Sequence, residues 1–339
     1  MDKEALIDML NRDLEDEHVS VTRYLIHAYQ AGEDTPLGAF MLSMAREEMW
    51  HMDWLADEIG EMGGEPSMKQ GVYPHDPTSN ASLLRSYIAW EENLVKMYMA
   101  QAAKVDKQDI KRVLMQQSKE SSIHAKRFAG MLAKLGPEGE EPLEKEEPGA
   151  FSPELTQRME GEMQGEYQLV LQHLRHSFVF EEDNCPVGSS LELTAMRHMK
   201  HLSVFAEELT EAGHDIEFKL PEIDMSESAA PALESDIALT DQARKRFIDL
   251  SQHPELEEHA GLKTELEQMI YQEEFLGADL EALQGEAGAP EPAPAPAPEQ
   301  ASEPESEPAP APASEQASEA EPETTPSTGF TVGSLIEKD

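Results

Sequence analysis

Apolar residues recur every three or four positions along most of the chain, which is the period of an amphipathic α-helix. In the first half this pattern predicts four helices, over residues 3–30, 37–62, 81–105 and 108–135. The pair Gly63-Gly64 is expected to end the second helix, and the proline-bearing stretch from Gly64 to Asn80 predicts a long connection to the third. The alternation of β-branched residues that indicates strands is absent nearly everywhere. The pattern therefore predicts an all-α protein.

The helical pattern occurs twice, in the same order. The segment from Glu17 to His27 aligns with the segment from Glu166 to His176, an offset of 149 positions (17 to 166). Glu48-Met49-Trp50-His51 aligns with His198-Met199-Lys200-His201, an offset of 150 positions (48 to 198). We therefore predict a tandem duplication, with a first domain at residues 1–136, an acidic linker at 137–152 and a second domain at 153–284. Ser152-Pro153-Glu154 carries the signals that open a helix, a capping serine, a first-turn proline and an early glutamate.

The composition changes sharply after the second half. Residues 285–328 consist almost only of Ala, Pro, Glu, Ser, Gln and Thr. Such a segment has no apolar surface to offset the entropy lost on ordering, so we predict a disordered tail. Apolar residues return only within residues 329–339. A short apolar peptide at the end of a flexible tether is typical of a docking device.

The charge and cysteine content narrow the class of protein. The formal net charge is −43, which argues against nucleic-acid binding because phosphates must be neutralised by Lys and Arg. An acidic surface suits a protein that concentrates cations, although solubility or adaptation to high salt would give the same excess. Cys185 is the one cysteine, so neither a disulfide framework nor a cysteine-based metal site is expected. With no leader-like opening and no apolar run of membrane-spanning length, we expect a cytoplasmic protein that does not enter a membrane.

Charged residues occupy core positions in the first half. The buried stripes of the four predicted helices place Glu17, Glu48, His51, Glu91 and His124 inward. On the third helix the stripe is read as Leu84, Ile88, Glu91, Val95 and Tyr98, so that Glu91 rather than Glu92 faces in. Unpaired buried carboxylates are very costly, so this set requires a compensating cation. Oxygen and imidazole ligands without thiolate suit iron or manganese, with zinc as a further option.

These residues resemble the ferritin-like superfamily, with bacterioferritins and rubrerythrins the most similar members. The resemblance implies two tandem ferritin-like four-helix bundles, of which the second is degenerate. The family holds dinuclear iron with one glutamate from each of two helices and a Glu-x-x-His from each of the other two. Glu17, Glu48-Met49-Trp50-His51, Glu91 and His124 match that arrangement. The chain departs from it at Ser121, where the glutamate paired with His124 is expected. Glu120 is the candidate replacement, and water is the alternative.

The second half carries an altered set of the same residues. Glu17 and His51 correspond to Glu166 and His201. Glu48 is replaced by His198, Glu91 by Thr240 and His124 by Glu273, whereas Asp241 and Glu274 are expected to face outward. Two histidines and two carboxylates would form at most a mononuclear site. A degenerate copy retained for packing is the competing interpretation.

The resemblance also raises the question of haem. Bacterioferritins bind haem across a subunit dyad through the methionine that follows the second helix's glutamate. Met49 stands at that place, and Met199 stands at its equivalent in the second half. If the halves form an intrachain pseudo-dimer, or two chains form a homodimer, the two sulfurs would meet one haem b. With 18 methionines in the chain, core packing is the competing interpretation.

The last apolar residues resemble the cargo-loading peptides of proteins packaged in encapsulin nanocompartments. The matching segment is Phe330-Thr331-Val332-Gly333-Ser334-Leu335-Ile336. The resemblance implies that an encapsulin shell protein is a partner and that the chain resides in the shell lumen.

Together these resemblances imply an encapsulin-packaged ferroxidase that oxidises Fe(II) to Fe(III) with O2 or H2O2. Glu17, Glu48, His51, Glu91 and His124 would hold iron, and Tyr24 or Tyr98 would donate an electron. Two alternatives remain: a peroxide-consuming enzyme similar to rubrerythrin or manganese catalase, and a metal-binding cargo without catalysis.

Overall fold

A computed structural model describes residues 2–143, 151–180 and 185–287. The predicted acidic linker lies partly outside these residues, and the predicted tail and docking peptide lie outside them almost entirely. Within the described ranges the protein is all-helical, as predicted, with no strand beyond one isolated bridge between Ser79 and Pro142. None of the helices in these ranges has both the length and the apolar character needed to cross a membrane.

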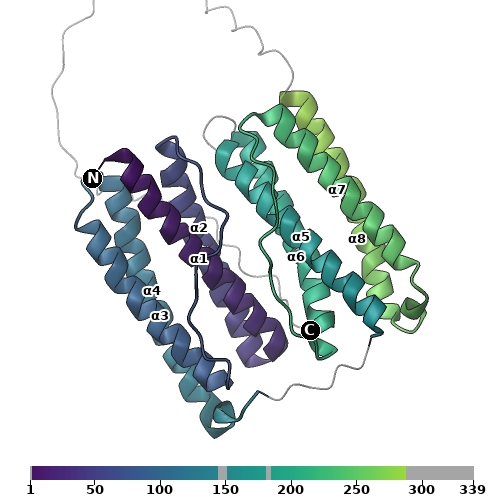
Figure 1. Cartoon of the computed structure of the whole chain (residues 1–339), viewed down its shortest axis with the longest axis horizontal. Helices are drawn as coiled ribbons and strands as arrows, with labels where there is room; N and C mark the ends of the chain where they lie inside the picture. The colour runs from purple at the N-terminus through teal and green to yellow at the C-terminus, as the bar shows by residue number, and fades with distance from the viewer. Residues whose placement is uncertain (1, 144–150, 181–184, 288–339) are drawn as a thin grey trace, which may run out of the picture. The chain divides into compact units, whose positions relative to one another are not determined.

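Eight α-helices and two short 3-10 helices make up the described part of the chain (Figure 1). Their bounds are α1 Lys3–Ala31, α2 Pro36–Glu61, α3 Asn80–Ala102, α4 Gln108–Leu135, η1 Gly136–Glu140, α5 Pro153–Phe180, α6 Cys185–Glu211, α7 Ala229–Ser251, η2 Pro254–Glu257 and α8 Ala260–Ala287. The lengths of α1–α4 are 29, 26, 23 and 28 residues, and those of α5–α8 are 28, 27, 23 and 28. The second half therefore repeats the helix order of the first.

Local sequence signals explain where the helices begin and end. Thr35 caps α2 by accepting a hydrogen bond from the Gly38 N–H at 3.0 Å, with proline at the first helical position. Ser152 caps α5 in the same way, as predicted, accepting from the Leu155 N–H at 3.2 Å. Gly63 follows α2 with a φ of 63°, and Gly213 follows α6 with a φ of 79°, conformations that favour glycine.

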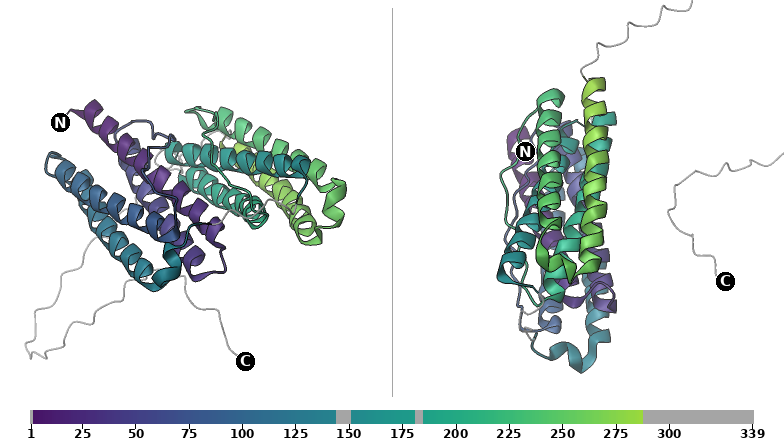
Figure 2. Two further views of the ribbon diagram at one scale, coloured as in Figure 1. Left: turned by 60° about the horizontal axis from the view of Figure 1, so that its bottom comes forward. Right: turned by 90° about the vertical axis from the view of Figure 1, so that its right-hand side faces the viewer.

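Helices pack in pairs within each half. In the first half α1 packs along α2 and α3 along α4, and in the second half α5 packs along α6 and α7 along α8. Figure 2 shows the helices of each half running along one another. In each half a long connection without regular structure joins the second helix of the set to the third, as expected for the first half from its prolines.

The two halves also touch each other. Helix α1 contacts α6 and α2 contacts α5, and one apolar cluster contains Ile26, Tyr29 and Ala56 together with core residues of the second half. The Tyr167 hydroxyl lies 2.7 Å from His18 Nε2. Tyr167 follows His18 by 149 positions (18 to 167), the offset of the sequence repeat, so corresponding places in the two halves meet at this contact.

Candidate metal centres

The first candidate centre gathers polar side chains from four helices. Glu17 comes from α1, Glu48 and His51 from α2, Glu91 from α3 and His124 from α4, and none is more than 1% exposed. On α3 the neighbouring Glu92 is exposed, so the predicted choice of the inward-facing glutamate is confirmed. The structure thus brings these five predicted site residues together in the core of the first half.

Glu48 lies between the two histidines. Its Oε2 is 2.8 Å from His51 Nδ1, and its Oε1 is 2.9 Å from His124 Nδ1. A second carboxylate lies near the same nitrogen of each histidine, with Glu17 Oε2 at 3.7 Å from His51 Nδ1 and Glu91 Oε1 at 3.9 Å from His124 Nδ1. The imidazole rings are stacked, with centroids 5.3 Å apart. The arrangement is nearly symmetric about Glu48.

Two partly exposed carboxylates hold the histidines from outside. His51 Nε2 lies 3.0 Å from Glu120 Oε2, and His124 Nε2 lies 3.1 Å from Glu47 Oε2. Glu47 also pairs with Arg127. An imidazole Nε2–H that donates to a carboxylate leaves its Nδ1 free to bind a metal inside. Glu120, considered from the sequence as a ligand replacing the missing glutamate, therefore lies on the outer side of His51 and orients it.

Tyrosine hydroxyls reach the terminal carboxylates. Tyr24 donates a hydrogen bond of 2.7 Å to Glu91 Oε1, and its hydroxyl lies 3.1 Å from that of Tyr73. Tyr98 donates to Glu17. Both tyrosines named from the sequence are therefore in contact with the candidate centre, and Tyr73 extends the network toward the connection between α2 and α3.

The electrostatics of the first centre distinguish Glu48 from its neighbours. Burial opposes ionisation of Glu48, but the two adjacent imidazoles outweigh it and lower its pKa. Burial would lower the pKa of His51 and of His124, yet the Glu48 carboxylate raises both. Burial, with the nearby Glu48 charge, raises the pKa of Glu91, and burial likewise raises that of Glu17. Glu48 and the two histidines therefore each favour the charged form of the other.

The donor atoms of the first centre fit a bound cation. Neither Glu48 oxygen makes a well-directed hydrogen bond despite its close approach to an imidazole, and the same holds for both Nδ1 atoms. Glu17 Oε2 and Glu91 Oε2 also lack hydrogen-bond partners, as does the buried Ser121 hydroxyl. Buried polar atoms are normally satisfied, so an inward-facing set of this kind is explained by ligands that complete it. Glu48, His51 and His124 offer atoms close enough to share one metal ion.

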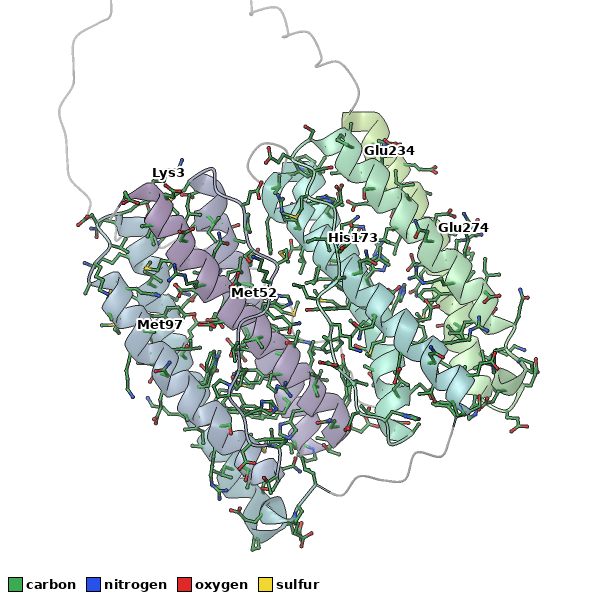
Figure 3. All side chains as sticks on the ribbon, viewed as in Figure 1. Lys3, Met52, Met97, His173, Glu234 and Glu274 are labelled. Atoms are coloured by element: carbon green, nitrogen blue, oxygen red, sulfur yellow. The ribbon has the colours of Figure 1, made fainter. Side chains whose placement is uncertain are left out.

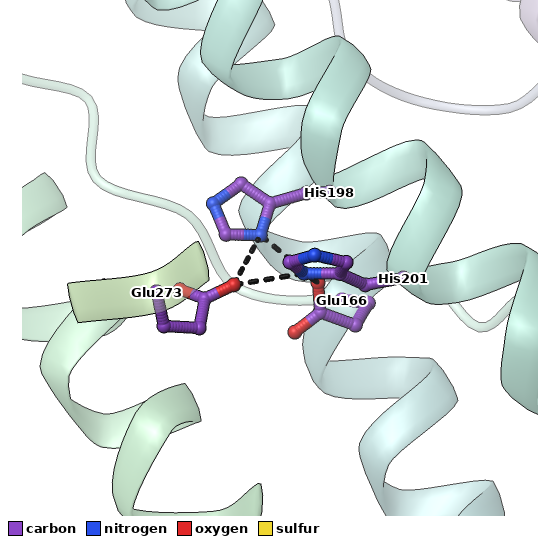
Figure 4. Close-up of side chains that lie close together, drawn as sticks. All are labelled: Glu166, His198, His201 and Glu273. Carbon is purple, nitrogen blue, oxygen red and sulfur yellow. Dashed lines mark hydrogen bonds and ion pairs between the residues drawn. The ribbon is translucent and has the colours of Figure 1, made fainter. Parts of the chain in front are cut away.

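The second candidate centre is more compact. His198 and His201 of α6, Glu166 of α5 and Glu273 of α8 point toward one another (Figure 4). Their four ligand atoms lie within 4.8 Å of one another and all four residues are buried. His198 Nδ1 is 2.9 Å from Glu166 Oε2, and His201 Nδ1 is 2.8 Å from Glu273 Oε1. The structure thus joins all four second-half residues predicted from the repeat, in a group that could hold a metal ion.

The surroundings of the second centre are less acidic than those of the first. His201 Nε2 meets the amide oxygen of Gln272 at 2.7 Å, where the corresponding histidine of the first half meets a carboxylate. Thr240 occupies the place of Glu91 and is buried, and Asp241 and Glu274 are exposed, as predicted. Burial disfavours the Glu166 anion, but His198 outweighs it and lowers the Glu166 pKa to about 2. The pKa of His201 is raised against burial to about 10, because the Glu166 and Glu273 carboxylates lie 3.5 and 2.8 Å from its Nδ1.

The methionines considered for haem are both half-buried. Met49 packs against the apolar cluster of the first half that includes Leu10, Leu14 and Leu55. This contact accounts for Met49 as a packing residue, and the haem hypothesis stays a prediction from the sequence.

Sequence reasoning missed two of the outer partners of the histidines. Glu47 and Gln272 each stand beside an inward-facing glutamate and point away from the core, so the apolar pattern gives no sign of them. It also missed the polar cluster of His173, His176 and Asp236, described below. The chain matches no known family model and no curated protein, so the residues themselves carry the functional argument.

Proposed function

We propose that the first centre binds two iron ions and oxidises Fe(II) to Fe(III), and that each half of the chain is a ferritin-like four-helix bundle. The observation that carries this proposal is the position of Glu48 between His51 and His124. Each oxygen of Glu48 faces a different imidazole, and each imidazole has its own further carboxylate, Glu17 or Glu91. One carboxylate shared between two equivalent sets of ligands is the arrangement expected for a pair of metal ions.

The charge around the first centre favours a trivalent product. Three carboxylates line the centre, and two more, Glu47 and Glu120, contact the outer nitrogens of its histidines. Outer carboxylates raise the basicity of the imidazole ligands, which stabilises a more highly charged cation. At the second centre two carboxylates and a neutral outer amide give less negative charge. Oxidation is therefore assigned to the first centre and binding of a divalent cation to the second.

The reaction balances without a further reductant. Two Fe(II) ions, as substrate, supply two electrons to O2, which takes up two protons and leaves as H2O2 while two Fe(III) ions form. His51 and His124 would bind iron through Nδ1, which must be unprotonated for this, while each Nε2–H donates to an outer carboxylate. The hydroxyl of Tyr24 donates a hydrogen bond to Glu91 and so orients this carboxylate, and the balanced reaction needs no electron from the tyrosine.

We propose further that the C-terminal peptide loads the protein into an encapsulin shell. Support comes from the sequence alone: the segment from Phe330 to Ile336 follows a long tether of Pro, Ala and Glu residues. Co-expression with an encapsulin shell protein tests this. Shells should retain the full chain through sedimentation and lose a chain that ends at residue 328. Equal retention of both chains would contradict cargo loading by the C-terminal peptide, and the proposal of iron oxidation would not depend on that result.

Iron oxidation is tested by mixing the metal-free protein with Fe(II) and then with O2 while following absorbance of the ferric product. The full chain should oxidise two Fe(II) ions per chain in a fast phase, because one pair fits the first centre. Glu48→Gln should slow this phase at least tenfold, whereas Glu92→Gln, which removes an exposed charge one position from a proposed ligand, should leave it unchanged.

Two outcomes would count against the proposal. Oxidation by Glu48→Gln at the unaltered rate would show that the reaction does not depend on the shared carboxylate. Rapid turnover of added H2O2 with no consumption of O2 would replace iron oxidation by the peroxide-consuming alternative.

A further inference from the structure

A row of buried histidines and aspartates lies beside the second centre. His173 and His176 come from α5 and Asp236 from α7, and all three are fully buried (Figure 3, which labels His173). Asp224, on the connection between α6 and α7, has a side chain that is 29% exposed. These four residues, here called the His–Asp row, run from the surface to a ligand of the second centre.

Successive members of the His–Asp row lie close together. From outside inward, Asp224 Oδ2 is 3.6 Å from His176 Nε2, and His176 Nδ1 is 2.9 Å from Asp236 Oδ2. Asp236 Oδ1 is then 4.0 Å from His173 Nε2. The His173 ring stacks on that of His198, a residue of the second centre, with centroids 5.1 Å apart and planes at 11°. The donor atoms of successive members of the row are thus 4.0 Å apart or less, and the stacked rings bring the row to the second centre.

Several atoms of the row have no hydrogen-bond partner. They are Oδ2 of Asp224, Nε2 of His176 and both ring nitrogens of His173. Two ligands at about 2.1 Å from one metal ion and 3.6 Å from each other subtend about 118°, near the tetrahedral and trigonal angles that first-row metals accept. A water-completed divalent cation therefore fits between Asp224 and His176.

Gln172 fixes the two aspartates of the row. Its Oε1 accepts a hydrogen bond of 3.1 Å from the Asp224 N–H, and its Nε2 donates one of 2.8 Å to Asp236 Oδ1. One turn earlier on α5, Gln168 donates to the Glu222 carbonyl at 2.8 Å and holds the same connection. The irregular segment that carries Asp224 is thus anchored to α5, so the outer end of the row has a defined geometry.

The first half has no corresponding row among its described residues. The positions 149 residues before His173, His176 and Asp236 are Tyr24, His27 and Tyr87. Tyr24 and Tyr87 pack edge to face with centroids 4.9 Å apart, and His27 Nε2 lies 2.9 Å from Asn80 Oδ1. An aromatic core in which a single imidazole contributes one unpartnered nitrogen, His27 Nδ1, offers few cation ligands. The His–Asp row is therefore particular to the second half.

We propose that the His–Asp row is an uptake route through which a divalent first-row metal ion reaches the second centre. Asp224 and His176 form the outer binding position, and Asp236 and His173 form the inner one. The ion then passes to His198 and the other residues of the second centre by exchange of ligands. This inference rests on the assignment of divalent-cation binding to the second centre, and it is independent of iron oxidation at the first.

Cobalt(II) is a suitable probe because it binds nitrogen and oxygen ligands and its visible absorption reports their geometry. Metal-free full-length protein is mixed with Co(II) in a stopped-flow instrument. The kinetic phase that is lost in His198→Ala is assigned to loading of the second centre. Anomalous scattering from crystals of the same protein soaked at low Co(II) then locates the bound ions.

Asp224→Asn and His176→Gln should each slow this phase at least tenfold and leave the final occupancy of the second centre unchanged. Glu222→Gln, which removes an exposed charge two positions from Asp224, should load at the unaltered rate. Anomalous density between Asp224 and His176 would mark the outer position. Loading of both variants at the unaltered rate would overturn the proposal, as would an empty second centre at saturation. Fe(II) oxidation in Asp224→Asn should be unaffected, so failure of either proposal can be recognised separately.

Discussion

Glu120 provides a quantitative test of how the first centre is held. The substitution Glu120→Gln retains an oxygen that can accept from His51 Nε2, found 3.0 Å from the carboxylate, but removes the negative charge. The orientation of the ring should therefore survive while its basicity falls. The hydrogen bond to His51 lowers the pKa of Glu120, so the group that is lost is a carboxylate anion.

The size of the effect follows from the exposure of the pair. Substituting a residue that hydrogen-bonds to a metal ligand weakens metal binding about 10- to 100-fold, which is about 1.4 to 2.7 kcal/mol. The Glu120 side chain is 31% exposed and its other oxygen is held by Gln116, so solvent screens part of the charge. We expect Glu120→Gln to weaken binding about tenfold, and Glu120→Ala, which also frees the ring, to approach 100-fold.

Anaerobic competition between the protein and a chromophoric chelator for Co(II) measures these affinities. The second half has no counterpart of Glu120, because Met269 stands at the corresponding position (120 to 269). The Co(II) affinity of the second centre should therefore not change and serves as an internal reference. Glu92→Gln controls for loss of a surface charge. Binding by Glu120→Gln within twofold of the unaltered chain would refute the reasoning, and so would equal weakening in Glu92→Gln.

Further predictions concern packing and the contact between the halves. Phe205→Ala should lower the free energy of unfolding by about 3–5 kcal/mol, because Phe205 is fully buried. The same change at Phe275, which is 52% exposed, should lower it by about 0.5 kcal/mol or less. Equal shifts of the two melting temperatures, followed by circular dichroism, would contradict this. Burial lowers the pKa of His18 to about 4. Below pH 6.5 His18 is therefore protonated in the unfolded chain but not in the folded one, so the free energy of unfolding decreases as the pH decreases. From pH 7 to 5 this amounts to about 2 kcal/mol, which His18→Gln should remove from the pH dependence measured by urea denaturation; identical slopes for both proteins would contradict it.

Helix periodicity predicted most of what the structure shows in the first half. It distinguished Glu91 from Glu92 because one position on a helix turns a side chain by 100°, enough to separate core from solvent. The same stripe assigned Ile88 and Val95 to the core, whereas the structure buries Tyr87 and Leu94 more deeply. A buried helix face is broader than a single row of residues. The apolar pattern therefore shows which side of the helix faces the core, but not which residues lie at the border of that side.

The end of α3 shows a second limit of periodicity. The sequence predicts a helix to residue 105, but α3 ends at Ala102. Val105 nevertheless packs in the core at 4% exposure, so the spacing of buried apolar residues continues beyond the end of the helix. Apolar spacing reports burial, and the backbone conformation must be inferred from it.

The polar partners of the candidate centres were harder to predict. Alignment of the halves brought together Glu166, His198, His201 and Glu273, since each inherits its position from a helix in the repeat. Asp224 lies on an irregular connection, where neither period nor repeat fixes a side chain. The direction of Glu120 depends on the rotation of α4 about its axis, which the sequence pattern determines only to within about one residue.

The central claim is that Glu48 joins two iron ions in the first centre. Mössbauer spectroscopy of the full chain, loaded without oxygen with two equivalents of 57Fe(II) and frozen soon after mixing with O2, tests this claim most directly. The account predicts a pair of magnetically coupled ferric ions that Glu48→Gln fails to form. Magnetically isolated ferric ions in the unaltered chain, or iron that stays ferrous, would contradict it.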